Sequence, residues 1–206
     1  MAPIEFLDVA EETGLVVQLG EFVLGRACAP LGIELSVKLS ARQLVDSSLI
    51  ETVDRMLRAS GLTPSRLRLE VTETVLMRDV KTSSKILASL RELGVSIGVD
   101  DFGTGYSSLA YLRRLPIDAL KVDRSFVSRL AEERHDHEIV KAVLFLANAL
   151  ELTVVAEGIE TEAQRRAVRR LGCTQGQGYL FARPAPIVDV PGLIADLPVW
   201  AAAGVR

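Results

Sequence analysis

Acidic and basic side chains recur in this sequence at spacings that suit a metal or phosphate site. Two adjacent carboxylates, Asp100 and Asp101, follow a short apolar run and precede a glycine-rich turn. Glu70, Lys121 and Glu157 each lie at or just past the end of another predicted strand. Carboxylate oxygens are the ligands that Mg²⁺ and Mn²⁺ prefer, and an ammonium group attracts phosphate. The pattern therefore predicts chemistry at the ends of buried strands.

The elements that would carry these residues alternate regularly between strand and helix. Period-two alternation or short apolar runs predict strands at 33–39, 66–72, 95–99, 119–122, 152–156 and 178–181. Helical spacing of apolar residues predicts helices over 6–29, with a break at Gly14, and over 40–61, 86–93, 109–112, 135–150, 162–171 and 188–197. Such alternation is typical of a parallel sheet, either open and doubly wound or closed into a barrel.

Polar residues at consecutive strand ends favour the barrel. An open sheet would spread such residues along a line, whereas a barrel gathers consecutive strand ends around one centre. The residues concerned are Lys38, Glu70, Asp100 with Asp101, Lys121, Glu157 and Gln177. We therefore expect the fold class to be α/β, a modified (β/α)₈ barrel with about six strand-helix units that lacks its first strands. We expect residues 1–206 to form one such partial domain.

Composition narrows the possible partners. The chain has 206 residues, of which 49% are hydrophobic and 25% charged, enough for one sizeable core. Its net charge of -3 argues against a nucleic-acid polymer as ligand. The first residues lack the features of a signal peptide, and no apolar run reaches membrane-spanning length, so we expect a cytoplasmic chain without membrane insertion. Cys28 and Cys173 lack metal-ligand spacing and are expected to be small hydrophobic residues.

Seven motifs, in order along nearly the whole chain, resemble the EAL family of bacterial cyclic di-GMP phosphodiesterases. They are AEETGL at 10–15, LSARQ at 39–43, EVTE at 70–73, DDFGTGYSS at 100–108, LKVDRSF at 120–126, VAEGIET at 155–161 and QGYLF at 177–181. The resemblance implies a modified (β/α)₈ barrel. It also implies that two divalent cations, Mg²⁺ or Mn²⁺, hydrolyse one phosphodiester bond of cyclic di-GMP, a bacterial second messenger, to give linear pGpG.

The same resemblance implies the metal ligands. Glu70 and Asp100 would bind the first metal, Asp101 would reach the second, and Asp123 would be a further acidic contact to the second metal. Two-metal phosphoryl chemistry needs hard oxygen ligands that hold the cations roughly 4 Å apart. These four carboxylates supply ligands of that type.

The remaining roles also come from the resemblance. Lys121 would contact the attacking water or the phosphate, Glu157 would help to position a water at the metals, and Gln177 would hydrogen-bond within that network. Glu73 would steady the glycine-rich loop 103–108, which is part of the dimer face in relatives. We therefore expect cyclic di-GMP as ligand, with a homodimer or another protein domain as partner.

Two departures from the family pattern bear on activity. The glutamate of the family's name motif lies on early strands that this chain lacks. The family has a metal-binding asparagine where this chain has Lys38. Lysine offers no acceptor and carries a positive charge, so we expect Lys38 to neutralise the carboxylates and disfavour Mg²⁺. Turnover would then be weak or absent.

Three functional classes remain open. The chain could be a metal-dependent phosphodiesterase, a non-catalytic effector that binds cyclic di-GMP, or a dimerising interaction domain that uses the face around loop 103–108. An open barrel edge favours the third class, because unpaired strand edges attract partners. Hydrolysis, nucleotide binding without hydrolysis, and defined oligomers without either would distinguish the three.

Overall fold

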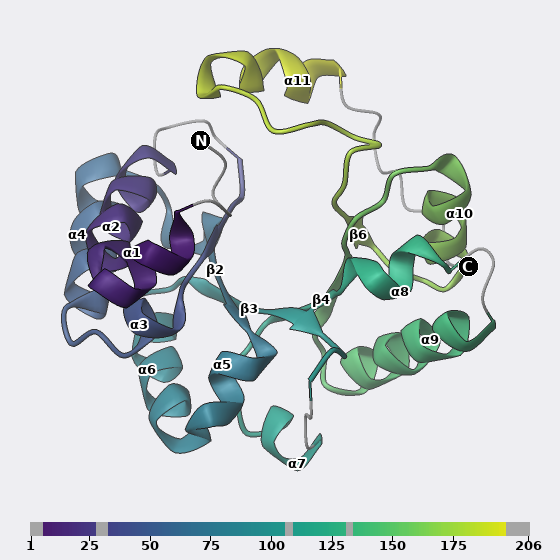
Figure 1. Cartoon of the computed structure of the whole chain (residues 1–206), viewed down its shortest axis with the longest axis horizontal. Coiled ribbons are helices and arrows are strands. Elements are labelled where there is room, and N and C mark those ends of the chain that lie inside the picture. Colours follow the sequence, from purple (N-terminus) through teal and green to yellow (C-terminus); the bar gives the residue numbers. More distant parts are fainter. Residues whose placement is uncertain (1–5, 28–32, 106–108, 131–133, 197–206) are drawn as a thin grey trace. The chain divides into compact units, whose positions relative to one another are not determined.

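The computed structural model describes residues 6–27, 33–105, 109–130 and 134–196 (Figure 1). The chain divides into two compact units, one formed by Met1–Gly98 and Ser107–Ile117, the other by Val99–Tyr106 and Asp118–Arg206. Within the described residues, six strands follow one another in the order β1-β2-β3-β4-β5-β6. Strand β3 (Ser96–Phe102) contributes its residues up to Gly98 to the first unit and the rest to the second. The strand order confirms the predicted repetition of strand-helix units.

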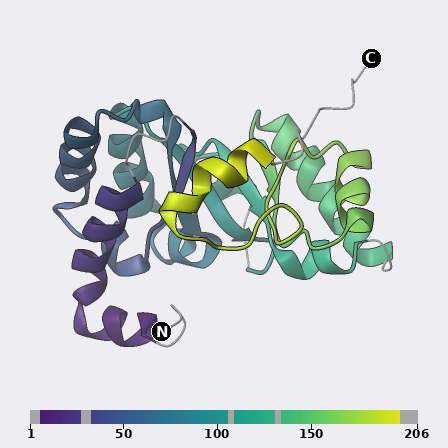
Figure 2. The ribbon, with the colours of Figure 1, turned by 90° about the horizontal axis from the view of Figure 1, so that it is seen from above.

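The first unit places a helical layer around its strands. Its elements are α1 (Leu7–Thr13), α2 (Leu15–Ala27), β1 (Leu35–Lys38), α3 (Ala41–Leu44), α4 (Leu49–Ser60), the 3₁₀ helix η2 (Pro64–Arg66), β2 (Leu67–Thr72), α5 (Glu73–Arg78), α6 (Val80–Glu92), the start of β3, and α7 (Leu109–Leu112). The predicted first helix is broken at Gly14, where φ is 83°, and Figure 2 shows α1 and α2 changing direction there. This confirms the predicted break.

Strands β1 and β2 pair in parallel, and their register sets the two faces of the first unit's sheet. Val37 lies opposite Leu69, and Lys38 lies opposite Glu70. Successive residues of a strand point to opposite faces, so the odd-numbered residues form the apolar face, where Leu69 and Val71 are fully buried. The other face carries Lys38 and Glu70 side by side.

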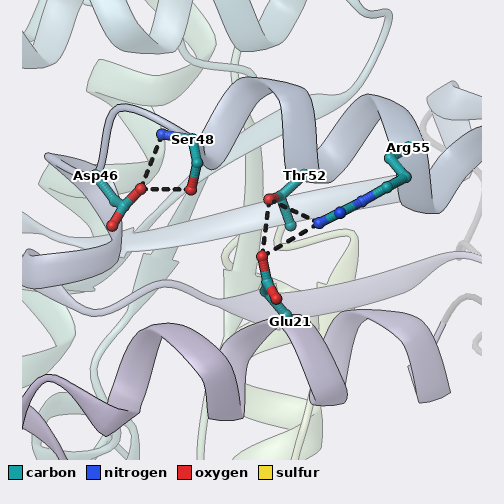
Figure 3. A network of polar contacts seen from close by, with 5 residues as sticks. All are labelled: Glu21, Asp46, Ser48, Thr52 and Arg55. Atoms are coloured by element: carbon teal, nitrogen blue, oxygen red, sulfur yellow. Dashed lines mark hydrogen bonds and ion pairs between the residues drawn. The ribbon is translucent and has the colours of Figure 1, made fainter.

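Polar side chains join α4 to α2 (Figure 3). The Thr52 hydroxyl and the Arg55 guanidinium both donate to Oε1 of Glu21, at 3.0 and 3.2 Å. Just before α4, the hydroxyl and the backbone N–H of Ser48 donate to Oδ1 of Asp46, at 2.5 and 2.8 Å. These bonds favour the ionised carboxylate and lower the pKa of Asp46 below its ordinary value.

A capping box starts α3, directly after β1. The Ser40 hydroxyl accepts from the backbone N–H of Gln43, and the Gln43 side chain accepts from the backbone N–H of Ser40. Gln43 is buried against Gly20 of α2, where a Cβ atom would lie 1.7 Å from the Gln43 amide nitrogen. Gly20 therefore makes room for the side chain that begins α3.

The second unit packs helices against the later strands. After β3 its elements are β4 (Ala119–Val122), α8 (Arg124–Ser128), α9 (Arg134–Ala149), β5 (Thr153–Ala156), α10 (Glu162–Arg170), β6 (Gln175–Gly176), the 3₁₀ helix η3 (Ile187–Asp189) and α11 (Val190–Asp196). Helix α9 packs on β4 and β5, and α10 packs on α8 (Figure 1). All four residues of β4 are buried, which is typical of a strand covered on both faces.

A second capping box starts α10. The Thr161 hydroxyl accepts from the backbone N–H of Gln164, whose side-chain oxygen accepts from the backbone N–H groups of Thr161 and Glu160, at 2.9 and 2.8 Å. The amide nitrogen of Gln164 also donates to the carbonyl of Ser128 at the end of α8. The buried side chain of Gln164 thus joins the start of α10 to the end of α8.

The predicted sixth strand at 178–181 is wrong in position. The strand is β6, Gln175–Gly176, which pairs in parallel with Val155 and Ala156 of β5. Residues 178–181 form a turn instead, closed by the backbone N–H of Phe181 donating to the carbonyl of Gly178 at 3.1 Å. Its apolar run Tyr-Leu-Phe resembles a strand by composition, but the turn is fixed by contacts that lie far away in the sequence.

Two short helices were not predicted. Helix α5 begins immediately after β2, and α8 immediately after β4, where Asp123 caps it by accepting from the backbone N–H of Ser125 at 2.9 Å. Both are short, with six and five residues, and each begins within two residues of a strand end. None of the helices in the described part of the chain has both the length and the apolar character to cross a membrane.

Candidate functional site

Three side chains of the second unit meet at the carboxyl ends of neighbouring strands. Lys121 of β4 places its Nζ 3.1 Å from Oδ1 of Asp100, which comes from β3, and in contact with Oε1 of Glu157, which follows β5. Only 4% of the Lys121 side chain and 3% of the Asp100 side chain are exposed, against 17% for Glu157. The sequence-predicted Asp100, Lys121 and Glu157 are therefore brought together by the structure.

Asp101 completes an acidic group with these residues. Asp100, Asp101 and Glu157 each offer a carboxylate oxygen, and these atoms lie within 4.8 Å of one another. Asp101 has a backbone φ of 53°, in the left-handed region that residues other than glycine rarely adopt. The hydroxyl of Thr104 donates to the carbonyl of Asp101 at 2.8 Å and helps to hold the turn that follows. The unusual backbone of Asp101 lies where the sequence predicts chemistry.

The donor set of this group fits a divalent cation. Three carboxylates lie close together here, and the ammonium of Lys121 contacts two of them, Asp100 and Glu157. Oxygen-only ligands at close mutual distances suit hard cations such as Mg²⁺, Mn²⁺ or Ca²⁺. A cation bound there would add positive charge beside the three carboxylates.

Glu70 lies in the first unit and has Lys38 beside it. Glu70 is 6% exposed in the second half of β2, while Lys38 is exposed at the end of β1 and opposite Glu70 in the strand register. Paired parallel strands are about 4.8 Å apart, so the two side chains start from neighbouring points on one face. The ammonium of Lys38 is thus well placed to balance the Glu70 carboxylate.

Gly98 of β3 makes room for Glu70. A Cβ atom at Gly98 would lie 3.5 Å from Cγ of Glu70 and 3.3 Å from Cδ of Arg68. Arg68, two residues before Glu70, also donates to the Ser96 hydroxyl at 3.5 Å. The glycine thus lets two long side chains of β2 cross the neighbouring strand.

The other predicted site residues have identifiable positions but untested roles. Asp123 caps α8, Gln177 is exposed just after β6, and Glu73 is buried at the start of α5. The roles of Asp123 as a metal ligand, Gln177 in the network and Glu73 in steadying loop 103–108 stay predictions. Part of that loop, 106–108, lies outside the described residues.

Tyr179 and Arg183 were missed as a pair by the sequence reasoning. The guanidinium carbon of Arg183 lies 4.8 Å from the centre of the Tyr179 ring. A tyrosine and an arginine four residues apart can be in contact, and this spacing was the only signal of the pair in the sequence. The ring contact depends on the turn at 178–181, which the sequence pattern predicted as a strand. Both residues lie shortly after Gln177, in the second unit.

Cys173 behaves as predicted. The residue is buried, its Sγ lies 3.2 Å from the carbonyl of Gln175 and 3.4 Å from that of Val154, and burial raises the pKa of its thiol. A neutral buried thiol is a small hydrophobic residue rather than a metal ligand. Cys28 lies outside the described residues.

Known proteins resemble this chain in sequence. MucR of Pseudomonas aeruginosa, a bifunctional diguanylate cyclase/cyclic di-GMP phosphodiesterase, is 47% identical over 204 residues, which cover 95% of this chain and 30% of MucR. The cyclic di-GMP phosphodiesterase NbdA of the same organism is 45% identical over 196 residues, 91% of this chain and 25% of NbdA. The chain thus spans less than a third of the length of these relatives.

Solved structures resemble it in fold. The MucR phosphodiesterase in complex with c-di-GMP superposes with a TM-score of 0.88 at 46% identity, covering 92% of this chain and 81% of that one. BlrP1 of Klebsiella pneumoniae, in a calcium and c-di-GMP complex, gives a TM-score of 0.81 at 32% identity, covering 89% of this chain and 48% of that one. These similarities confirm the predicted fold class, a modified (β/α)₈ barrel.

The family assignment follows from the match along the chain. A family model described as the EAL domain matches residues 1–184. That range contains Asp100, Asp101, Lys121 and Glu157, the residues that form the acidic group and its central ammonium. The chain therefore belongs to the EAL domain family.

Proposed function

We propose that this chain acts as an EAL-type phosphodiesterase domain that hydrolyses cyclic di-GMP to linear pGpG, with low turnover. The observation that carries the proposal is the group of Asp100, Asp101 and Glu157 around Lys121 at the ends of parallel strands. Relatives that are 45% and 47% identical are cyclic di-GMP phosphodiesterases by name, which supports the same substrate here.

The acidic group would hold divalent cations, Mg²⁺ or Mn²⁺. Asp100, Asp101 and Glu157 would supply ligands, and the family resemblance adds Glu70 and Asp123. When bound, the cations stabilise the negative charge that develops on the phosphoryl oxygens. The chain itself contributes the carboxylates and the buried position that keeps them close together.

Lys121 has two tasks in this proposal. It holds Asp100 and Glu157 at one ammonium, so both carboxylates keep a fixed direction. Its ammonium would also contact a phosphate oxygen or the attacking water. Glu157, the more exposed of the two carboxylates, would orient that water, and Gln177 would hydrogen-bond beside it.

Low turnover is inferred from Lys38. Its register position opposite Glu70 gives that carboxylate an ammonium as neighbour. An asparagine at this position would offer an oxygen to a cation, whereas lysine offers only donors and repels the cation. Glu70 is then balanced by the protein itself and is a poorer metal ligand.

The same observation favours a second candidate, a non-catalytic effector. If Lys38 suppresses metal binding enough, the chain would bind cyclic di-GMP without cleaving it and would pass the signal on through a homodimer or another protein domain. We place either activity in the cytoplasm, where a soluble nucleotide messenger would be met.

Product analysis tests the proposal. The purified chain is incubated with cyclic di-GMP and Mn²⁺ or Mg²⁺, and pGpG is measured by chromatography. We expect slow pGpG formation that Asp100→Asn abolishes and that Asp189→Asn, at an exposed carboxylate of η3, leaves unchanged. Saturable binding without pGpG would assign the effector role instead. Neither binding nor product would overturn both candidates.

A further inference from the structure

The turn that follows β3 holds Asp101 in a backbone conformation that needs support from its surroundings. The φ angle is 53° at Asp101 and 99° at Gly103. A residue other than glycine keeps a positive φ only where neighbouring groups hold it there. Thr104 closes the turn from within, since its hydroxyl and its backbone N–H both donate to the carbonyl of Asp101, at 2.8 and 3.4 Å. These bonds lie inside the turn, so they do not fix the turn against the rest of the second unit.

The aromatic ring of Phe126, in α8, packs against this turn. A Cβ atom on Gly103 would lie 3.1 Å from Cε2 of Phe126 and 3.5 Å from its Cζ. The edge of the ring therefore rests on the glycine, with little space for a side chain between them. Phe126 is half-buried, and both residues belong to the second unit. The ring thus meets the turn two residues away from Asp101.

Helix α8 is anchored at both ends, which keeps the Phe126 ring in place. Asp123 caps its first turn. Val127, the residue after Phe126, is fully buried. Directly after the helix, Nε of Arg129 lies 3.1 Å from Oδ2 of Asp136 in α9. A short helix with these contacts can act as a rigid support for the turn.

The same helix also contacts the loop that carries Glu157. A Cβ atom on Gly158, where φ is 68°, would lie 2.5 Å from Cβ of Arg124. The glycine therefore lets the first residue of α8 approach the backbone of that loop. Helix α8 also follows β4, the strand that carries Lys121. It is thus in contact with the segments on both sides of the acidic group.

We propose that Phe126 is a positioning residue for Asp101, whose ring keeps the turn in the conformation that binds a divalent cation. The inference rests on the proposed function and adds a residue that touches neither the cation nor the nucleotide. Without the ring, the turn could move into the space left behind, and Asp101 could relax to an ordinary φ. Its carboxylate would then leave the group that it forms with Asp100 and Glu157. Weaker cation binding is the direct consequence.

Titration of the full chain with Mn²⁺, without nucleotide, tests this role independently of turnover. Electron paramagnetic resonance of the free ion gives the dissociation constant even where binding is weak. For Phe126→Ala we expect binding about tenfold weaker than in the wild type, the size of effect typical of removing a residue that orients a metal ligand. Phe126→Leu keeps an apolar side chain against Gly103, and we expect binding only about threefold weaker.

Two control variants separate positioning from a general loss of stability. Val127→Ala removes fully buried apolar volume from the neighbouring position of α8, so it should lower the melting temperature. Phe145→Ala removes a ring that is 78% exposed on α9. Both should bind Mn²⁺ like the wild type at temperatures well below melting. A merely structural Phe126 would behave like Val127, with a lower melting temperature and an unchanged affinity.

The outcomes distinguish this inference from the proposed function. Wild-type affinity in Phe126→Ala, or an equal loss in Phe126→Ala and Val127→Ala, would overturn the positioning role and leave the phosphodiesterase proposal standing. The expected loss in a chain that makes no pGpG would support positioning and overturn the phosphodiesterase. A wild type that binds no Mn²⁺ would overturn both. If Phe126→Ala does not fold, Phe126→Leu decides, and wild-type affinity in that variant would contradict the inference.

Discussion

The strand ends of the two units carry the same types of charged residue in different proportions. In the first unit, one ammonium of Lys38 stands opposite one carboxylate of Glu70. In the second unit, the ammonium of Lys121 is shared by Asp100 and Glu157, with Asp101 close by. A carboxylate beside an ammonium attracts a cation less strongly than a group of several close carboxylates does. We therefore expect Glu70 to contribute little to cation binding while Lys38 is beside it.

The charged side chains of the two units also differ in how far they are buried. Lys121 and Asp100 are almost wholly removed from water, while Lys38 is exposed. Charges in a partly buried site interact several times more strongly than charges in water. Removing one partner therefore has a larger effect on stability in the second unit than in the first.

The largest expected effect comes from Lys121→Met. The substitution removes the ammonium that the buried Asp100 shares with Glu157, and breaking a buried ion pair typically costs about 3–5 kcal/mol. We expect urea unfolding in EDTA to show a loss of about 3 kcal/mol or more. Lys141→Met, at an exposed lysine of α9, is the matched control and should change stability by less than about 0.5 kcal/mol. Equal stability of the two variants would contradict the charge comparison.

Removing the glutamine of either capping box should lower the free energy of unfolding by no more than Lys121→Met does, and by a different amount for each box. Gln164 accepts from two backbone N–H groups and donates to Ser128, while Gln43 accepts from the backbone N–H of Ser40. At about 1 kcal/mol for each hydrogen bond, Gln164→Ala should cost more than Gln43→Ala, about 3 against 1 kcal/mol. The order is read from urea midpoints. Because Gln43 also fills the space beside Gly20, the double variant Gly20→Ala/Gln43→Ala tests whether packing reverses that order.

The smallest expected effect is the pH dependence of stability contributed by one helix cap of the first unit. Asp79 caps α6, and its bonds from the Thr82 hydroxyl and backbone N–H lower its pKa from the ordinary value of 3.8. A carboxyl with a lower pKa in the folded state stabilises the fold above pH 3.8, and this stabilisation is lost as the pH falls through the folded pKa. Melting temperatures between pH 5 and pH 3 should therefore fall less steeply, by about a degree, in Asp79→Asn than in the wild type. Equal slopes would show that the cap carries no such linkage.

The sequence predicts the elements that repeat and misses those fixed by distant contacts. The strands that carry or precede Asp100, Lys121 and Glu157 follow from apolar runs, and the convergence of these residues follows from parallel topology. The turn at 178–181 does not, because its position depends on the approach of Gly178 to the backbone of Ile159. Composition alone cannot distinguish such a turn from a strand.

The sequence predicts which residues belong to the site better than it predicts which of them contact one another. Residue types at strand ends indicated Lys121 and Glu157, but that Lys121 contacts two carboxylates at once appears only in three dimensions. The opposition of Lys38 and Glu70 depends on the register of β1 and β2, which sequence periodicity leaves open by steps of two residues. Asp123, by contrast, lies two residues before Ser125 in a pattern typical of a helix cap, and that signal was present in the sequence.

Metal titration of the wild type and of Lys38→Asn tests the central claim most directly. Calorimetry with Mn²⁺ measures the affinity without any need for turnover, and Lys141→Asn serves as the control for the loss of one exposed positive charge. If Lys38 balances Glu70 in place of a cation, the wild type should bind Mn²⁺ weakly and Lys38→Asn about tenfold more tightly, equivalent to about 1.4 kcal/mol. Micromolar binding by the wild type, or equal affinities in the wild type and Lys38→Asn, would contradict this account.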